Sequence, residues 1–396
     1  MTGSTVDQLI CRQLPETTLA ELNRPPLINP KVRYRDLAVK DGALRRRLLA
    51  AVDEVLRDGR LLMGPAVERW ERLIASYCGA RYCIGVSSGT DAIYLALRVC
   101  GISAGDEVIL PAMSWVATVN AVALVGATPV FVDIGDDLNI DVEQIEPAIT
   151  SATRAILPVH YTGRLCDMDA ICKIALRNNL FIIEDAAQAF GASDGERYAG
   201  GFGNAGAFSL NPMKVFPGYG EVGAVLVNDE AMDARIRALR YLGTVNKEVC
   251  IEPSLNFKID TIQAAMMLVS FDQLDPALTR RNVIAARYGD GLKTLVGCPK
   301  SPMSPTDRKA VFFDYTITTR RREELHRFLE RRGIEAKVRH PLLLPDHPAY
   351  RSYYKKPLPN AERLVTQILS LPIHEKLNDD EVDYVIEVIC EFHKLA

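Results

Sequence analysis

The sequence predicts an α/β fold built on a mainly parallel sheet. Between residues 82 and 185, short apolar runs of strand length alternate with segments that have helical periodicity. Strands that are apolar throughout are typical of parallel sheets covered by helices on both faces. The chain has 396 residues, 48% of them hydrophobic, which is enough for two or three structural units. In such sheets, ligands bind at the carboxyl ends of the strands.

Before the sheet, the chain contains an arm and two helices. Residues 1–30 show little periodicity and end in a proline-rich stretch, so we expect a loosely held arm. Apolar residues at helical spacing predict a helix from Asp41 that stops at Gly59. A second helix is expected through Trp70 and Leu73.

Five apolar strands are predicted in the alternating region, at 82–86, 107–110, 129–133, 155–159 and 181–185. Helices are expected after the first strand, from about 116 to 125, and around 170–176. Further along, two apolar runs flank the turn that carries Lys214. Together these elements form the predicted large domain.

The C-terminal part predicts a smaller α+β domain. After the Lys214 turn we expect a helix near 231–239 and then a long helical region from about 259 to 295, with a break at Pro276, that joins the two domains. Beyond it, helices are expected at 322–331, near 361–369 and at 380–392, and strands at 309–319 and near 335–338. The chain is therefore divided into an arm (1–30), a large domain (31–270) and a small domain (271–396). The helices within 31–75 are expected to pack near the small domain.

The composition excludes several classes of protein. The net charge is −3, so no basic excess attracts nucleic acid or an anionic membrane. No apolar run is long enough to span a membrane, and the N-terminus lacks the apolar core of a signal peptide. Nine cysteines without a Cys-x-x-Cys pair indicate reduced thiols in a cytoplasmic protein. Six histidines without metal-ligand spacing predict no metal site.

The turn at 211–223 carries one lysine, Lys214, among prolines, glycines and apolar residues. Loss of water around its ammonium lowers a lysine's pKa, and a neutral amine can form a Schiff base with a carbonyl. Ser209, five residues earlier, could reach the phosphate of a bound cofactor. Taken alone, the turn also fits a surface lysine on a hairpin.

Three other segments follow predicted strands. Gly89 and Thr90 open a helix and could offer backbone amides and a hydroxyl to a phosphate, although an ordinary N-cap explains them equally well. Trp115 could stack on a flat cofactor ring or could simply belong to the core. Asp185 ends an apolar strand, where a carboxylate needs a partner. The protonated nitrogen of a pyridine ring is one such partner, and Gln188 could bond the ring's phenolic oxygen; capping of the next helix is the alternative.

The order of these segments along the chain is more informative than any one of them: a phosphate loop, an aromatic, a strand-end aspartate and then a lysine. A dinucleotide site would need Gly-x-Gly-x-x-Gly after an early strand, and the glycines at 200–203 lack that context.

The same residues give the chain its resemblance to the pyridoxal-phosphate-dependent sugar aminotransferases of the DegT/StrS type. The resemblance covers residues 34–392. It rests on the matching stretches 88–92, 105–111, 129–133, 158–160, 184–192, 208–221, 262–265 and 371–374. It implies a fold-type I transferase, with a seven-stranded type of sheet between helices and a smaller C-terminal domain.

The resemblance also implies roles for individual residues. Lys214 is expected to be the Schiff-base lysine and proton shuttle, and Asp185 to pair with the pyridine nitrogen. For pyridoxal 5′-phosphate binding, the further expected residues are Gly89, Thr90, Trp115, Gln188 and Ser209. Asn256 resembles the asparagine that reaches the cofactor phosphate of the neighbouring subunit, so a homodimer with shared sites is expected; a loop asparagine before a helix is the alternative.

The expected reaction is transfer of an amino group from L-glutamate or L-glutamine to a keto sugar, either nucleotide-linked or a cyclitol ketone. The chain departs from the family pattern at Val222, at 240–243, at Phe190, at Arg164 and at 338–341, mostly in substrate-side loops. Three alternatives stay open. A related sugar dehydratase would carry histidine in place of Lys214. A regulatory protein would hold the cofactor without turnover, and a fold relative would act on amino acids only.

Overall fold

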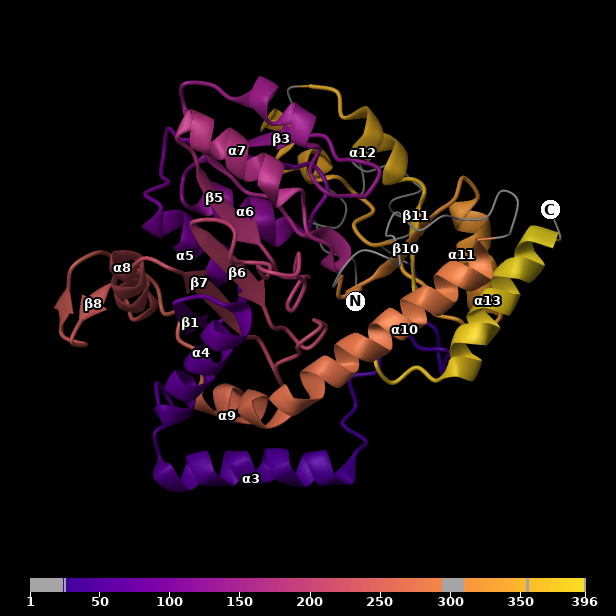
Figure 1. Ribbon diagram of the computed structural model, residues 1–396, viewed down its shortest axis with the longest axis horizontal. Coiled ribbons are helices and arrows are strands. Elements are labelled where there is room, and N and C mark those ends of the chain that lie inside the picture. The colour runs from indigo at the N-terminus through magenta and orange to yellow at the C-terminus, as the bar shows by residue number, and fades with distance from the viewer. Residues whose placement is uncertain (1–23, 25, 294–309, 354–355, 395–396) are drawn as a thin grey trace, which may run out of the picture.

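The computed structural model describes residues 24, 26–293, 310–353 and 356–394, and its largest feature is a seven-stranded sheet (Figure 1). The expected arm lies almost wholly outside these described residues. The strands are β1 (Tyr82–Val86), β2 (Glu107–Pro111), β3 (Thr128–Val132), β4 (Thr153–Ile156), β5 (Phe181–Asp185), β6 (Ala205–Ser209) and β7 (Gly223–Val227).

The strand order is β1-β7-β6-β5-β4-β2-β3. Strand β7 runs antiparallel to both of its neighbours, and the other neighbouring pairs are parallel. The predicted α/β class and mainly parallel sheet are therefore confirmed.

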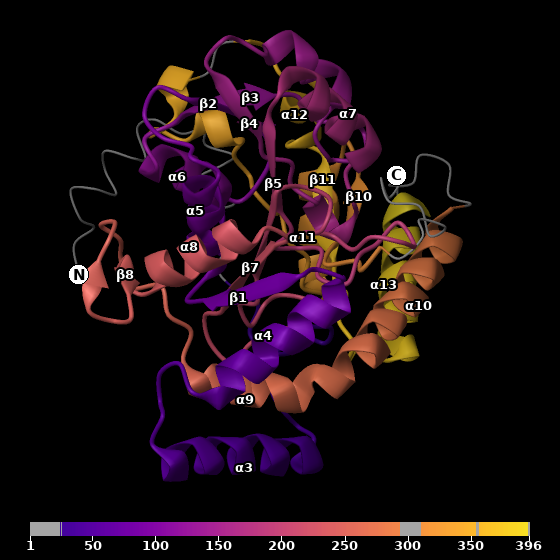
Figure 2. The same ribbon diagram turned by 60° about the vertical axis from the view of Figure 1, so that its left-hand side comes forward.

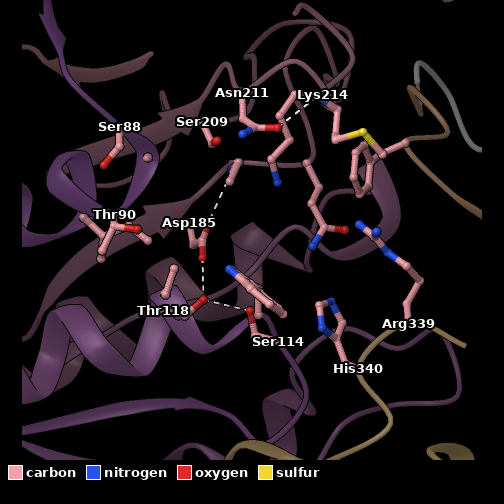
Figure 3. Close-up of a pocket in the computed structure, with 18 of the residues that line it drawn as sticks. Ser88, Thr90, Ser114, Thr118, Asp185, Ser209, Asn211, Lys214, Arg339 and His340 are labelled. Carbon is pink, nitrogen blue, oxygen red and sulfur yellow. Dashed lines mark hydrogen bonds between the residues drawn. The ribbon is translucent and has the colours of Figure 1, made fainter. Parts of the chain in front are cut away.

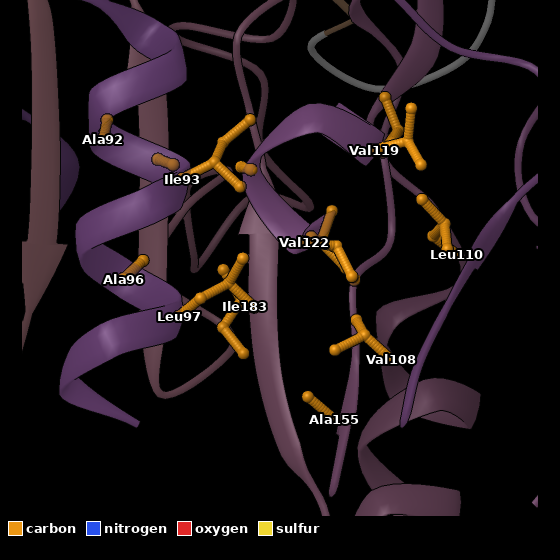
Figure 4. Packing of buried hydrophobic residues seen from close by; sticks show 14 of the residues in the cluster. Ala92, Ile93, Ala96, Leu97, Val108, Leu110, Val119, Val122, Ala155 and Ile183 are labelled. Carbon is orange, nitrogen blue, oxygen red and sulfur yellow. The ribbon is translucent and has the colours of Figure 1, made fainter. Parts of the chain in front are cut away.

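Helices cover both faces of the sheet, because successive strand residues point to opposite sides. On one face, Val108 and Leu110 pack with α5 (Gly89–Val99), α6 (Val116–Leu124) and α8 (Glu230–Arg240), as Figure 4 shows for α5 and α6. On the other face, Ile109 packs with α7 (Met168–Asn178), and Leu226 with α4 (Pro65–Cys78). This alternation leaves the strands buried on both sides.

The preceding helix, α3 (Gly42–Asp58), packs on α9 (Thr261–Ser270), and α4 packs on α9 and β1. Figures 1 and 2 agree in placing α3 beneath α9. The two helices therefore lie against the large sheet and α9, and they also reach the start of the expected small domain: Arg47 pairs with Asp272 at 2.9 Å, and the Tyr77 ring lies 5.5 Å from that of Phe271.

The C-terminal unit has its own core around the antiparallel pair β10 (Tyr315–Thr318) and β11 (Ile368–Leu371). Three helices surround this pair: α10 (Leu274–Leu292), α11 (Arg322–Arg331) and α13 (Asp379–Lys394). The short helix α12 (Pro359–Leu364) precedes β11, and β8 (Thr244–Val245) with β9 (Val249–Cys250) forms a separate hairpin. The exact domain boundaries remain a prediction.

Four predictions about local structure were wrong. The helix expected at 361–369 ends at Leu364, because 368–371 pairs with β10. The strand expected at 309–319 is only β10, and near 335–338 a single bridge joins Lys337 to Ser370. The long helix breaks at 271–273. Pro276 lies in the first turn of α10, where a missing amide costs no hydrogen bond.

Candidate active site

A pocket of about 630 Å³ opens where four strands of the large sheet end (Figure 3). Ser88 follows β1, Ser114 follows β2, Asp185 ends β5 and Ser209 ends β6, and all four line the pocket. These four strands run in the same direction, so their carboxyl ends meet at one edge of the sheet, where ligands bind in such folds. Among the described residues, no helix has the length and apolar character needed to cross a bilayer.

The structure brings together seven of the eight residues that the sequence singled out. The pocket lining includes Gly89, Thr90, Trp115, Asp185, Gln188, Ser209 and Lys214. Asn256 lies elsewhere, exposed on a loop whose backbone is bridged to Tyr241.

One end of the pocket is a narrow cradle at the N-terminus of α5. Ser88 caps this helix by accepting a hydrogen bond from the Asp91 amide at 3.2 Å, so the expected N-cap is present. A Cβ on Gly89 would lie only 2.4 Å from the Ser209 Cβ, so glycine is required for this close approach. Ser88, Gly89 and Thr90 also line the pocket, which places the positive end of the helix dipole at the cavity.

Asp185 lies in the floor of the pocket and is only 5% exposed. The Thr118 hydroxyl donates to its Oδ2 at 2.7 Å, and the Ala187 amide donates to its Oδ1 at 3.1 Å. Thr118 is linked in turn to Ser114 at 2.7 Å. Both donors to Asp185 are uncharged, and they fix the orientation of its carboxyl group.

The Gln188 side chain has a fixed orientation. Its Oε1 accepts a hydrogen bond from the Thr162 backbone amide at 2.8 Å. Because a backbone N–H can only donate, the oxygen of the Gln188 amide must face Thr162. The amide nitrogen is therefore the end that can donate into the pocket.

Lys214 lies on the turn between β6 and β7, and its backbone amide donates to the Asn211 carbonyl at 2.8 Å. Its Nζ is 4.9 Å from the centroid of the Phe313 ring. Burial lowers the pKa of Lys214 to about 8, while Asp185 raises it and Arg339 lowers it further. A substantial fraction of this lysine is therefore a neutral amine near physiological pH.

The wall opposite the sheet comes from the C-terminal unit, and the sequence had assigned its residues no role. Phe313, Arg339 and His340 line the pocket there. His340 has a positive φ of 49°, and its ring lies 5.7 Å from that of Trp115, which is 59% exposed at the pocket. Burial, then Arg339, lowers the pKa of His340 to about 3, so this histidine is neutral at working pH.

Thr118 is a further residue that sequence reasoning missed. A hydroxyl in the first turn of an apolar helix carries no distinctive signal, and its role appears only when α6 is placed beside β5. The sequence at 338–341 differs from the family pattern. This difference was the one signal in the sequence that indicated Arg339 and His340.

Comparisons with known proteins agree with this geometry. The model of the DegT/DnrJ/EryC1/StrS aminotransferase family matches residues 43–390. The chain is 38% identical, over 91% of its length and 98% of the relative's, to the "Pleiotropic regulatory protein" of Geobacillus stearothermophilus. It is 39% identical, over 92% of its length and 96% of the relative's, to the dTDP-3-amino-3,4,6-trideoxy-alpha-D-glucose transaminase of Streptomyces venezuelae.

Among solved structures, the chain is similar to NtdA from Bacillus subtilis with bound cofactor PMP. The TM-score is 0.85 at 31% identity, and the match covers 99% of this chain and 93% of that one. The similarity therefore extends over both the large sheet and the C-terminal unit.

Proposed function

The chain belongs to the DegT/DnrJ/EryC1/StrS aminotransferase family and is an enzyme of the sugar aminotransferase class. On this basis, we propose that it transfers an amino group from L-glutamate or L-glutamine to a keto sugar. The observation that carries this proposal is a lysine of lowered pKa and a buried aspartate that line one pocket.

The residues of the pocket fit pyridoxal 5′-phosphate. Glycine at position 89 lets the α5 N-terminus and Ser209 lie against each other, and both line the pocket, where backbone amides and hydroxyls can bind a phosphate. Asp185 has an oriented carboxylate for a pyridine nitrogen, and Gln188 has a donor for the ring's phenolic oxygen. Lys214 can attach to the aldehyde, and Trp115 can cover the ring. When bound, this cofactor supplies an electron sink that stabilises negative charge on a substrate carbon.

In this proposal, Lys214 is also the residue that transfers the α-carbon proton of the donor. With the cofactor bound, the Lys214 Nζ would accept the proton from the α-carbon of the donor as a general base and would donate it again as a general acid. Its lowered pKa suits both roles near neutral pH. The apolar ring of Phe313 beside Nζ limits access of water to this proton.

The acceptor is assigned by class only. The Streptomyces venezuelae relative is named as the transaminase of a dTDP-linked sugar, which favours a nucleotide-linked keto sugar. A cyclitol ketone is the second possibility, since the stretch 338–341, which departs from the family pattern, lines the pocket.

We also propose a homodimer in which Asn256 reaches the pocket of the second copy. The hairpin region carries exposed apolar side chains, including Val245 (42% exposed), Val249 (62%) and Leu255 (66%). Such a patch is typical of a protein interface. Sedimentation should give a dimer, and Asn256→Ala should weaken cofactor binding without changing this mass; a monomeric protein of full activity would contradict the proposal.

The test of the proposed function is turnover with defined substrates. Protein loaded with pyridoxal 5′-phosphate is incubated with L-glutamate or L-glutamine and with a panel of nucleotide-linked keto sugars and keto cyclitols. Mass spectrometry of the amino product identifies the acceptor. One relative is named a "Pleiotropic regulatory protein", so the alternative function is regulatory, with cofactor binding but no turnover. A loaded protein that never consumes a donor would support that alternative and contradict ours.

A further inference from the structure

Arg339 is placed at the far end of the pocket from the phosphate cradle. In Figure 3, Ser88 and Thr90 lie on one side of the cavity and Arg339 with His340 on the other. Arg339 and Lys214 flank the same ring: the Arg339 Cζ is 5.2 Å and the Lys214 Nζ is 4.9 Å from the centroid of Phe313. A small molecule that reacts at Lys214 is therefore within reach of the Arg339 guanidinium.

The charges around Arg339 do not balance. Its Nε forms an ion pair with Asp314 Oδ2 at 3.2 Å, but Arg35 shares the same carboxylate, 2.8 Å from Oδ1. Tyr34 donates a hydrogen bond to Oδ1 as well. One carboxylate thus serves two guanidinium groups, which leaves this cluster with an excess positive charge.

The two arginines differ in how they are satisfied. Arg35 donates to the Ile373 and Phe313 carbonyls in addition to Asp314, and its side chain is only 6% exposed. Arg339 has the Asp314 ion pair through Nε, and 26% of its side chain is exposed. Within the described residues, no protein acceptor is recorded for its two terminal nitrogens. These nitrogens form the planar fork that binds carboxylate or phosphate through two hydrogen bonds.

Other carboxylates of the pocket are engaged elsewhere. Asp185 accepts hydrogen bonds from Thr118 and the Ala187 amide, and Glu221 accepts one from Asn211. Burial lowers the pKa of Arg339, but Asp314 and the tyrosines beside it raise it by more, so the net shift is upward and the group stays cationic. Because Arg339 shares its one carboxylate partner with Arg35, its positive charge at the pocket wall is balanced only in part, and an anion bound there would be stabilised.

We propose that Arg339 forms a subsite for an anionic oxygen group of the substrate, a carboxylate or a phosphate, with Asp314 as the residue that positions it. The assignment deepens the proposed function and rests on it. In a two-step transfer, the donor and the acceptor occupy this pocket in turn. The group is therefore either the carboxylate of the amino-acid donor or a phosphate or acid group on the acceptor.

The subsite is tested on protein loaded with cofactor, with Arg339→Met, Arg339→Lys and a control. Arg177→Met is the matched control, because it removes an arginine that pairs with Glu146 on the surface at 3.2 Å. Calorimetry with glutarate and with inorganic phosphate measures anion binding without turnover. We expect about 10- to 100-fold weaker binding of one anion to Arg339→Met, as for loss of a charged hydrogen-bonded pair. Arg339→Lys should fall between, because it keeps the charge but not the fork.

A second measurement separates the two sources of the anion. The half-reaction of each loaded variant with L-glutamate is followed over a range of concentrations. A raised half-saturating concentration in Arg339→Met identifies the donor carboxylate. An unchanged donor half-reaction with weakened phosphate binding identifies the acceptor.

Unchanged affinity for both anions and an unchanged half-reaction would overturn the inference. A wild-type protein that binds glutarate through Arg339 but converts no donor would instead contradict the proposed function. Unfolding temperature and the cofactor spectrum of each variant show whether the fold is intact. These readouts also separate a merely structural role of Arg339, which would lower stability and leave anion affinity unchanged.

Discussion

The two ends of the pocket are built differently. At the cofactor end, Gly89, Asp185 and Ser209 lie at or directly after strands of one sheet, and short hydrogen bonds to Asp185 orient its carboxylate. At the other end, Phe313 and Arg339 belong to irregular segments of the C-terminal unit, tied together through Asp314.

This difference separates residues that must hold a constant geometry from residues that can be replaced without loss of the fold. Residues at strand ends are held by the whole sheet, which suits a cofactor of fixed shape. Loops tolerate substitution without cost to the core, which suits recognition of different substrates. Under the proposed function, the cofactor end determines the reaction class, and the Arg339 end determines which substrates bind.

The largest effect is expected at the residue between the two ends. Lys214→Ala should lower turnover about a thousandfold or more, because it removes both the amine and the proton carrier. The control is Lys293→Ala, which removes an exposed lysine paired with Asp290 at 2.7 Å. Steady-state assays measure the effect, and Lys214→Ala with the turnover of the control would refute the mechanism.

Asp185→Asn tests the cofactor end. Loss of the charge opposite the pyridine nitrogen should weaken cofactor affinity about 10- to 100-fold, with little change in stability of the cofactor-free protein. Its neighbour Glu184 is a matched contrast, because it accepts hydrogen bonds from the Gly200, Phe202 and Gly203 amides. Glu184→Gln should instead lower stability by about 2 kcal/mol. Equal effects of the two changes on cofactor affinity would contradict these roles.

The lowered pKa of Lys214 predicts a pH-dependent stability of the cofactor-free protein. Its folded pKa of about 8 is below that of an unfolded lysine, so the unfolded chain binds more protons between pH 8 and about 10.4. Stability therefore rises with pH across this window, and the full penalty is present below it. Lys214→Met should remove the penalty and stabilise the protein by about 3 kcal/mol at pH 7.

Urea unfolding of both proteins at pH 7 and pH 10 checks this expectation. The advantage of Lys214→Met should shrink at the higher pH. An advantage of the same size at both values would show that burial does not lower this pKa.

The smallest effect is expected at Thr118, which contacts Asp185 through a hydrogen bond. Thr118→Val keeps the shape but removes the hydroxyl that donates to Asp185 at 2.7 Å. Cofactor affinity should fall about tenfold. Ser114→Ala, one hydrogen bond further away, should have a smaller effect. Fluorescence titration with the cofactor measures both, and the reverse ranking would contradict the order of these contacts.

The sequence predicted which residues gather at the strand ends for a physical reason. Apolar strands can be recognised in a sequence. Because parallel strands end at the same edge of the sheet, residues at their carboxyl ends, such as Asp185, lie close together there. Thr118 was missed because its hydroxyl matters only through its distance to a strand far away in the chain. Asn256 lies outside this pocket, and its assigned role stays a prediction.

The other end could not be derived in this way. Arg339 faces the pocket only because the C-terminal unit lies against the large sheet. The hydrophobic periodicity of the sequence does not predict how these two units pack. The error at 361–369 has the same origin, since the apolar residues at 368–371 are equally compatible with a helix until β10 is available as a partner.

The most direct test of the central claim is the visible absorbance spectrum of the purified protein with pyridoxal 5′-phosphate, before and after L-glutamate and then L-glutamine. We expect a visible band that depends on Lys214 and is lost when a donor is added. A spectrum identical to that of free cofactor, unchanged by Lys214→Ala and by both donors, would contradict it.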